Sequence, residues 1–369
     1  MSPLAWLGIV VGALVIVFVA QMIHLSVVLA WEDQKTRGLG YFGLPPDERE
    51  GFRKTLRTQA RLLFPILRFL GRVSPATLEK ASFRYRDVSG PKGTCNEESF
   101  AGANEYEVRP DDVFVVTQMK CGTTWMQHVV YEVLNRGGGD LVESGTALYA
   151  VAPWLEALKS VPVADAPLLG SERPSRVIKT HMPPEICPFS PDARYVYVAR
   201  HPASCFASCM DFLATNMGSF TPGLDAVEEW YCSDESMWWR SWPTHVRGWW
   251  ELSQRQDNVL FVRFEDMKAD LAAVARQVAD FLGMEPLTEQ ELERVVHKCG
   301  FAYMQEHRGA FEMHPPHILA IDAELFVKGT ADRHKDVPED TRQRIMAWCV
   351  EQMDAGPVSL AELYPDADS

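Results

Sequence analysis

A cationic, glycine-containing turn lies between two apolar runs in VFVVTQMKCGTTWMQHVVYEVL, residues 113–134. The first run is typical of a buried strand, and the second, which begins near Thr123, of a helix. A strand, a tight turn at Gly122 and a helix N-terminus direct unpaired backbone N–H groups at one point, where the helix dipole favours negative charge. Lys120 adds a full positive charge, and the hydroxyls of Thr123 and Thr124 can donate to the same oxygens. The turn therefore predicts a local phosphate-binding cradle.

The spacing differs from that of the GxxxxGK[ST] loop that binds nucleoside triphosphates. Lys120 precedes Gly122 here, and the first glycine of that loop is absent. Strand-turn-helix junctions with a glycine and a capping threonine are also common as purely structural features. From this turn alone, anion binding and simple helix capping are equally supported.

Two more candidate groups end a later apolar run, SRVIKTH, residues 175–181. A neutral imidazole accepts a proton near pH 7, and His181 follows a predicted strand at the end where ligand crevices open in parallel sheets. Lys179 places a second cation beside it. Taken alone, His181 is better explained as a strand-end histidine that donates to the backbone, and Lys179 as a solvated side chain.

A third cationic position follows the run RYVYVA and precedes Pro202, a favoured first residue of a helix. There the guanidinium of Arg200 stands at a helix N-terminus, where it can bind a phosphate through two parallel hydrogen bonds. Ser208 lies two turns further on and adds a hydroxyl. Without other information, Arg200 is best explained as a surface ion-pair residue and Ser208 as part of an ordinary helix.

The elements that must position these groups are four short apolar runs. They are DVFVVTQ (112–118), SRVIKTH (175–181), RYVYVAR (194–200) and NVLFVRFED (258–266). Such runs, separated by helical stretches, predict a parallel sheet that helices cover on both faces. The glycines at 137–139 are expected to end the helix that begins near Thr123, and Gly283 is expected to end a helix over 269–282.

Composition limits the class of protein. The 369 residues are 47% hydrophobic and 23% charged, which is enough for one large domain or two small ones. The net charge of −14 argues against a nucleic-acid partner, because such binding needs a cationic surface. The eight cysteines form no CxxC pair, so they predict reduced thiols in a cytoplasmic compartment rather than a zinc or disulfide framework. The HPPH stretch at 314–317 is not expected to bind a metal.

The N-terminus is expected to be a membrane anchor. Residues 3–31 contain no acid, Lys or Arg, and about 20 such residues cross a hydrocarbon layer of roughly 30 Å. Trp6 and Trp31 near its ends are typical of interfacial anchors. A cleaved signal peptide fits less well, because the basic start and the small-residue cleavage site are missing.

The distribution of charge predicts the orientation of this anchor. The first 34 residues hold no Lys or Arg, whereas the next forty hold nine, so the bulk of the chain is expected on the cytoplasmic side. The segment over 52–72 mixes arginines with leucines and phenylalanines, which fits equally a helix on the lipid surface and a helix packed on the soluble domain. We therefore expect a transmembrane anchor over 1–34, a basic juxtamembrane helical segment over 35–84 and a domain over 85–369.

The order K-x-G-T-T-W resembles the turn that holds the 5′-phosphosulfate end of 3′-phosphoadenosine 5′-phosphosulfate (PAPS) in the cytosolic sulfotransferase family. Its residues here are Lys120, Cys121, Gly122, Thr123, Thr124 and Trp125. Three later segments resemble that family in the same order: RVIKTHMPPEICP, RYVYVARHPASCFASCMDF and NVLFVRFEDMKADLAAVARQVADFLG. The resemblance covers most of residues 85–345. It implies a P-loop-like, three-layer α/β fold with a central parallel sheet.

The resemblance also implies roles for single residues. His181 is the general base, Lys120 faces the bridging oxygen of the leaving group, and Lys179 steadies the sulfuryl group. Arg200 and Ser208 bind the 3′-phosphate. Further nucleotide contacts carried over from the family are Phe301 on the adenine side, and Lys328 and Gly329 from its Arg-Lys-Gly run. PAPS is the co-substrate, and no metal ion is implied.

The sequence departs from the family pattern at three places. Val327 replaces the arginine of the Arg-Lys-Gly run, Cys299 and Gly300 replace the residues before Phe301, and Pro243 replaces a tyrosine. The first change removes a guanidinium from the 3′-phosphate, so nucleotide affinity falls unless another cation such as Arg333 substitutes. The family's dimerising terminal segment is not recognisable, which leaves the oligomeric state open.

The expected function is transfer of a sulfuryl group from PAPS to a hydroxyl of a hydrophobic small molecule or lipid, by a single-pass membrane protein. Six tryptophans within 21 residues are more typical of a core than of a pocket, but any exposed part suits a lipophilic acceptor from the bilayer. They are Trp230, Trp238, Trp239, Trp242, Trp249 and Trp250. Two alternatives remain, a non-catalytic membrane-anchored nucleotide-binding adapter and a lumenal carbohydrate sulfotransferase.

Overall fold

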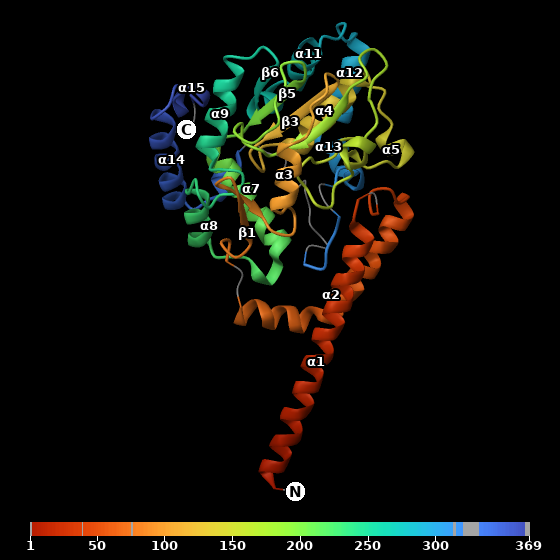
Figure 1. The fold of residues 1–369 in the computed structure, drawn as a ribbon, viewed down its shortest axis with the longest axis vertical. Helices are drawn as coiled ribbons and strands as arrows, with labels where there is room; N and C mark the ends of the chain where they lie inside the picture. Colours follow the sequence, from red (N-terminus) through yellow and green to blue (C-terminus); the bar gives the residue numbers. More distant parts are fainter. Residues whose placement is uncertain (1, 39, 75–76, 313–314, 320–331, 366–369) are drawn as a thin grey trace.

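An α/β body and a long N-terminal helix that projects from it make up the chain (Figure 1). The computed structural model describes residues 2–38, 40–74, 77–312, 315–319 and 332–365. The C-terminal end of the described chain lies on the body, far from the free end of the N-terminal helix (Figure 1).

Four parallel strands form the central sheet, in the order β4-β3-β5-β6. Their bounds are β3 (Asp112–Thr117), β4 (Arg176–Thr180), β5 (Arg194–Ala199) and β6 (Val259–Arg263). These are the four predicted runs, so the predicted parallel sheet is confirmed.

The fourth predicted run was too long, because residues 264–266 are not part of the strand. Helix α10 (Phe264–Ala269) begins directly after Arg263. Glu265 and Asp266 lie in its first turn, where acidic side chains complement the helix dipole, and Arg263 pairs with Asp266 at 2.6 Å. These local interactions favour a helix over continued strand pairing.

Alternate residues of the strands point into two separate apolar layers. Phe114, Tyr195 and Tyr197 belong to one layer, whereas Val115 and Val196 belong to the other. The first layer is covered by α7 (Pro202–Met217), α9 (Trp242–Ser253) and α14 (Glu339–Asp354), and the second by α4 (Thr123–Leu134), α11 (Leu271–Phe281) and α12 (Glu289–Lys298). Helices therefore cover both faces of the sheet, and the three-layer α/β fold is confirmed (Figure 1).

Smaller elements complete the body. They are the antiparallel pair β1 (Ser82–Tyr85) and β2 (Val88–Pro91), the helices α3 (Glu97–Asn104), α5 (Leu141–Ser144), α6 (Leu148–Val151), α8 (Leu224–Tyr231), α13 (Phe301–Glu306) and α15 (Leu360–Leu363), and the 3-10 turns η1 (Val163–Asp165), η2 (Gly218–Phe220), η3 (Arg308–Ala310) and η4 (Asp332–Asp336).

The junction between β3 and α4 has the predicted strand-turn-helix form. Two residues of the turn have left-handed backbone, Lys120 with φ 65° and Gly122 with φ 102°. A Cβ on Gly122 would lie 2.7 Å from Cδ2 of Phe264, so glycine is required there both by conformation and by space. Gly137 and Gly283, the predicted helix stops, follow the ends of α4 and α11 with φ 71° and 68°.

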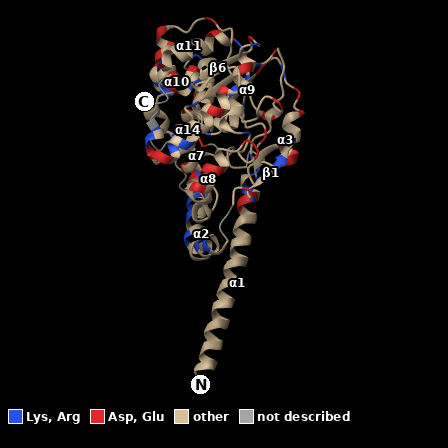
Figure 2. Ribbon diagram, turned by 90° about the vertical axis from the view of Figure 1, so that its left-hand side faces the viewer, with Lys and Arg blue, Asp and Glu red and all other residues tan. Residues whose placement is uncertain are grey.

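Helix α1 (Pro3–Thr36) is one helix long and apolar enough to span a membrane, by length and composition. Its most apolar 18-residue window has a mean hydropathy of 2.6 and is not buried in the protein. Figure 2 shows that its projecting part carries no Lys, Arg, Asp or Glu. A membrane anchor over 1–34 and the three-part division of the chain stay predictions.

Helix α2 (Pro46–Val73) packs on the body of the protein, as one of the two alternatives for the basic segment expected; a position on the lipid surface stays a prediction. Phe52, Leu56 and Leu63 are buried against the protein, whereas Leu62 and Phe64 are about half exposed. Pro65 lies inside the helix, and the part of α2 near its C-terminus runs across α1 rather than along it (Figure 1). The segment is thus a packed helix with one apolar surface left uncovered.

The requirement for glycine at position 122 leads to a prediction about the stability of the fold. We expect Gly122→Ala to lower the free energy of unfolding by about 1–3 kcal/mol, because alanine must adopt a left-handed conformation and displace the Phe264 ring. Urea denaturation in detergent would measure the change. Gly102→Ala in α3 is the control, since nothing lies within 4 Å of its added Cβ and alanine favours a helix. Equal midpoints for Gly122→Ala and the wild type would contradict the requirement for glycine.

Candidate active site

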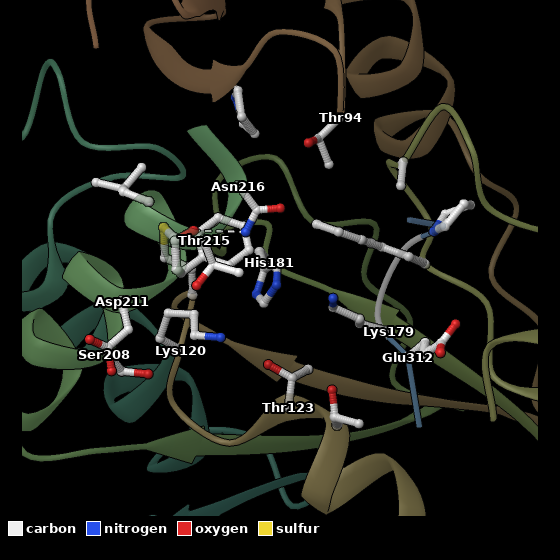
Figure 3. Close-up of a pocket in the computed structure, with 18 of the residues that line it drawn as sticks. Thr94, Lys120, Thr123, Lys179, His181, Ser208, Asp211, Thr215, Asn216 and Glu312 are labelled. Atoms are coloured by element: carbon white, nitrogen blue, oxygen red, sulfur yellow. Dashed lines mark hydrogen bonds between the residues drawn. The ribbon is translucent and has the colours of Figure 1, made fainter. Parts of the chain in front are cut away.

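One cavity collects most of the predicted site residues at the C-terminal ends of β3, β4 and β5. It encloses about 520 Å³, within the range of small-molecule sites. The predicted residues that line it are Lys120, Gly122, Thr123, Thr124, Trp125, Lys179, His181, Arg200, Ser208 and Phe301. Figure 3 shows Ser208 and Lys120 on one side of His181 and Lys179 on the other.

The start of α4 supplies the anion-binding part of the cavity. The first backbone N–H groups of a helix have no acceptor within it, and the turn at Gly122 points them toward the cavity. The hydroxyl of Thr123 bonds to that of Thr117 at 2.6 Å. The hydroxyl of Thr124 is buried and has no hydrogen-bond partner among the described residues. A buried hydroxyl in this position fits a ligand oxygen, because leaving it unpaired costs free energy.

Lys120 and Arg200 place two cations next to this helix end. Nζ of Lys120 lies 5.0 Å from the ring centroid of Phe212, and burial lowers the pKa of Lys120. Arg200 follows β5, donates from Nη1 to the carbonyl of Lys120 at 3.2 Å, and lies over the ring of Phe264 at 4.4 Å. The turn thus helps to orient Arg200, and Ser208 follows it on α7 along the same wall.

Lys179 is a buried cation held by an aromatic site. Its side chain is 1% exposed, and its Nζ donates to the hydroxyl of Tyr149 at 2.8 Å and lies 3.5 Å from the ring centroid of Trp154. Burial lowers the pKa of Lys179 to about 7, although the nearby carboxylate of Glu156 opposes the shift. A lysine of this kind gains its charge easily when an anion arrives.

The hydrogen bonds of His181 define which ring nitrogen carries the proton. Nδ1 lies 2.8 Å from the carbonyl oxygen of Thr117, which can only accept, so Nδ1 is the donor and Nε2 holds the lone pair. Burial and the nearby charge of Lys179 lower the pKa of His181 well below its usual value. The ring packs between Trp154 and Trp239 at 5.0 and 4.9 Å between centroids. His181 is therefore a neutral, oriented imidazole with an acceptor nitrogen.

Glu156 is a buried carboxylate that the sequence analysis missed. It accepts hydrogen bonds from the hydroxyl of Thr180 at 2.9 Å and from the backbone N–H of His181 at 2.8 Å. Burial raises its pKa. It lies in the loop before β4 and its partners lie 24 and 25 residues later, so local spacing held no signal for it. Glu156 fixes the end of β4 from which Lys179 and His181 reach the cavity.

The predicted adenine side consists of aromatic rings on separate elements. Nε1 of Trp125 donates to the carbonyl of Cys299 at 2.8 Å, and its ring meets that of Phe264 edge to face at 5.3 Å. Phe301 begins α13 and lines the same cavity. Cys299 differs from the family pattern in its side chain, but its backbone carbonyl still accepts the hydrogen bond that orients Trp125.

Some predicted residues do not join the cavity. Cys121 turns its side chain into the core, where its Sγ lies 3.7 Å from that of Cys205, so only its backbone belongs to the turn. Lys328 and Gly329 lie outside the described residues. Arg333 does line the cavity, but Asp211 and Asp336 pair with it, so its charge is largely neutralised.

Aromatic side chains also line the cavity around His181. Trp154, Trp238 and Trp239 contribute to the wall, of which only the last two belong to the tryptophan cluster noted in the sequence. Trp242 and Trp249 are fully buried and donate to the carbonyls of Arg200 and Met182. The cluster is therefore mostly core, as expected, with two members at the cavity. Within the described ranges, no group of three or more His, Cys, Asp or Glu could hold a metal ion.

The arrangement can bind an anionic nucleotide and accept a proton beside it. Lys120, Arg200 and the N-terminus of α4 can bind the phosphates of a nucleotide, and Thr124 offers its unpaired hydroxyl to the same anion. Nε2 of His181 can accept a proton. These features fit PAPS as the ligand that the sequence led us to expect.

Known proteins give the same picture. A family model described as the sulfotransferase domain matches residues 110–357. Sulfotransferase 2B1 of Mus musculus is 32% identical over 229 residues, which cover 60% of this chain and 65% of that protein. Sulfotransferase 1C2 of Oryctolagus cuniculus is 29% identical over 232 residues, which cover 60% of this chain and 75% of that protein. The match to the Mus musculus protein thus spans just under two thirds of its length.

Solved structures share the fold. Retinol dehydratase in complex with androsterone and the inactive cofactor PAP matches with a TM-score of 0.62 and 21% identity, over 76% of this chain and 94% of that chain. Mouse sulfotransferase SULT7A1 complexed with PAP matches with a TM-score of 0.56 and 20% identity, over 74% and 94%. Since the family model covers residues 110–357 of 369, this chain belongs to the sulfotransferase family.

Proposed function

We propose that this protein transfers a sulfuryl group from PAPS to a hydroxyl of a hydrophobic small molecule or lipid, while α1 anchors it in a membrane. The observation that carries the proposal is the arrangement of one cavity, in which Lys120, Lys179 and the start of α4 flank an imidazole whose acceptor nitrogen is Nε2. Family membership supports the choice of PAPS, and two solved neighbours are complexes with PAP.

The donor would occupy the side of the cavity formed by α4, α7 and α13. The N-terminal N–H groups of α4 and the hydroxyl of Thr124 would bind the 5′-phosphosulfate, and Arg200 with Ser208 the 3′-phosphate. Trp125 and Phe301 offer aromatic faces for the base. Lys328 and Gly329 remain predicted contacts by family resemblance.

The reaction exchanges one sulfur–oxygen bond for another. The acceptor oxygen forms a bond to sulfur as the bond from sulfur to the bridging phosphate oxygen breaks, and Nε2 of His181 takes the acceptor's proton. Negative charge grows on the leaving phosphate, where Lys120 can neutralise it, and Lys179 stabilises the equatorial oxygens of the moving group. Positioning and electrostatics thus supply most of the catalysis.

The aromatic wall supports a hydrophobic acceptor. Trp154, Trp238 and Trp239 lie on the side of the cavity where an acceptor hydroxyl would approach His181. Retinol dehydratase, a solved neighbour, is complexed with androsterone in one structure and with retinol in another, and both are apolar molecules. A non-catalytic adapter is the second candidate, favoured by one observation: Arg333, the cation expected to substitute for the arginine replaced by Val327, is paired with Asp211 and Asp336.

The first prediction concerns the base. We expect His181→Ala to reduce sulfate transfer from radiolabelled PAPS at least about 100-fold, because the variant lacks the imidazole nitrogen that accepts the acceptor's proton. Binding of PAP, measured by calorimetry, should change no more than a few-fold. The acceptor is chosen beforehand from a panel of phenols and lipid alcohols by mass spectrometry.

His297→Ala is the matched control, since His297 is exposed at the end of α12 and lies outside the cavity. Undiminished turnover in His181→Ala would reject the base. An absence of heat with PAP in the wild type would instead favour an adapter that has lost the nucleotide site.

The second prediction concerns Lys179. Its pKa of about 7 leaves it mostly neutral at pH 8, and the phosphates of PAP favour the charged form. We therefore expect PAP to bind at pH 8 with uptake of about one proton, measured by calorimetry in buffers of different ionisation enthalpy. Lys179→Met should remove most of this uptake, whereas Lys80→Met, on the exposed surface, should not. Equal uptake in both variants would show that Lys179 does not titrate on binding.

The third prediction concerns orientation. In sealed microsomes with their cytoplasmic face outward, added protease should digest the body of the chain without detergent, because the basic residues of α2 favour that side. A lumenal marker protein that stays intact shows that the vesicles are closed. A body that is protected until detergent is added would support the lumenal carbohydrate sulfotransferase instead.

A further inference from the structure

The apolar N-terminal helix forms part of the wall of the same cavity. Leu29 and Glu32 near the C-terminal end of α1 line it together with His181 and Lys179. The remaining wall on this side includes Ile318, from a segment more than 280 residues later in the chain. The candidate membrane helix and the candidate active site are therefore continuous.

A stripe on α1 holds this end of the helix against the body. Leu25, Val28, Glu32 and Thr36 recur every three or four residues and are buried, so they share one face. A carboxylate oxygen of Glu32 accepts a hydrogen bond from the backbone N–H of Ile318 at 2.9 Å, and Nζ of Lys159 lies 3.9 Å from the other oxygen. The position of Leu29 in the wall is thus fixed by buried contacts on both sides of it.

The length of α1 places this wall close to a bilayer surface. Residues 3–24 rise about 32 Å at 1.5 Å per residue, which crosses a hydrocarbon layer of roughly 30 Å. Leu29 lies five residues further on, or about 8 Å beyond that layer. The cavity therefore reaches the depth of the lipid head groups.

The end of α2 supports the same depth. The ring of Phe69 meets that of Phe18 edge to face at 6.1 Å, and His24 bonds to Gln59 at 2.7 Å, so this part of α2 lies beside residues 18–24 of α1. Apolar side chains stay exposed here among arginines; they are Leu62, Phe64, Phe69 and Val73 beside Arg61, Arg68 and Arg72. An apolar surface with basic residues that crosses the direction of α1 is typical of a helix in the membrane interface (Figures 1 and 2).

We propose that the cavity takes its acceptor directly from the bilayer, and that the acceptor is a hydroxyl-bearing membrane amphiphile whose tail passes Leu29. The hydroxyl reaches Nε2 of His181 between Trp154 and Trp239, and the tail lies along the end of α1. Leu29 is then a specificity-determining residue rather than part of a passive anchor. This inference names the acceptor class of the proposed sulfotransferase and rests on that proposal.

Photocrosslinking tests the route in the full chain. The protein is reconstituted in phosphatidylcholine vesicles that contain hexadecanol with a diazirine in its tail, irradiated, and mapped by mass spectrometry. We expect crosslinks on residues 25–33 and 315–319, besides those on the lipid-facing part of α1. Leu29→Trp places a larger side chain in the cavity beside residues 315–319, so it should reduce their labelling several-fold.

Leu14→Trp is the matched control, because Leu14 is 64% exposed on the same helix and lies outside the cavity. PAP calorimetry shows that each variant is folded; if Leu29→Trp no longer binds PAP, the smaller Leu29→Phe takes its place. Labels confined to residues 4–23, or labelling of 315–319 that Leu29→Trp leaves unchanged, would overturn the membrane route. A wild-type protein that binds no PAP but labels at 315–319 would reject the sulfotransferase reaction and leave the lipid site standing.

Discussion

The cost of burying positive charge is the constraint that organises this protein. Lys120, Lys179 and Arg200 approach one cavity from three adjacent strand ends, and burial lowers the pKa of both lysines. The surroundings offset part of this cost through aromatic faces at Trp154 and Phe264, and through the carboxylate of Glu156. A dianionic or trianionic ligand would complete the compensation. The site is thus arranged to bind an anion.

The parallel sheet makes that arrangement possible. Because all four strands run the same way, the residues after β3, β4 and β5 emerge at one edge, and the register places Val115 beside both Lys179 and Val196. The turn after β3 then needs glycine at 122 so that the ring of Phe264 can pack against it. That ring also lies under Arg200 and against Trp125, so one aromatic side chain links the anion turn, the guanidinium and the adenine side. A shift of the Phe264 ring would therefore disturb the turn, Arg200 and Trp125 together.

The N-terminal helix is more than an attachment. Its buried stripe and the Glu32 contacts make its inner end part of the body, while its outer part carries no charged residue. Arg53 of α2 likewise pairs with Glu312, and Tyr41 donates to the same carboxylate. Ordinary packing contacts thus join the inner end of α1 to the cavity.

Local patterns in the sequence were sufficient for much of this structure. The four strands, the helix stops at Gly137 and Gly283, the anion turn and the apolar helix each depend on residues close together in the chain, where periodicity and backbone preference act. The run at 258–266 was predicted too long by the largest margin among the strands, because side-chain pairing at Arg263 and Asp266 favours a helix there.

The tertiary structure alone decided how the site residues are set. The proton lies on Nδ1 of His181 because that nitrogen faces the carbonyl of Thr117. The pKa of Lys179 depends on its burial beside Tyr149 and Trp154 and on the charge of Glu156. Arg333 is not a free cation because it pairs with Asp211. The inward orientation of the Cys121 side chain and the position of Leu29 in the cavity wall also depend on tertiary contacts. Each is a contact between segments far apart in the chain. Burial and partner geometry at such contacts arise only when the elements pack, so no local pattern encodes them.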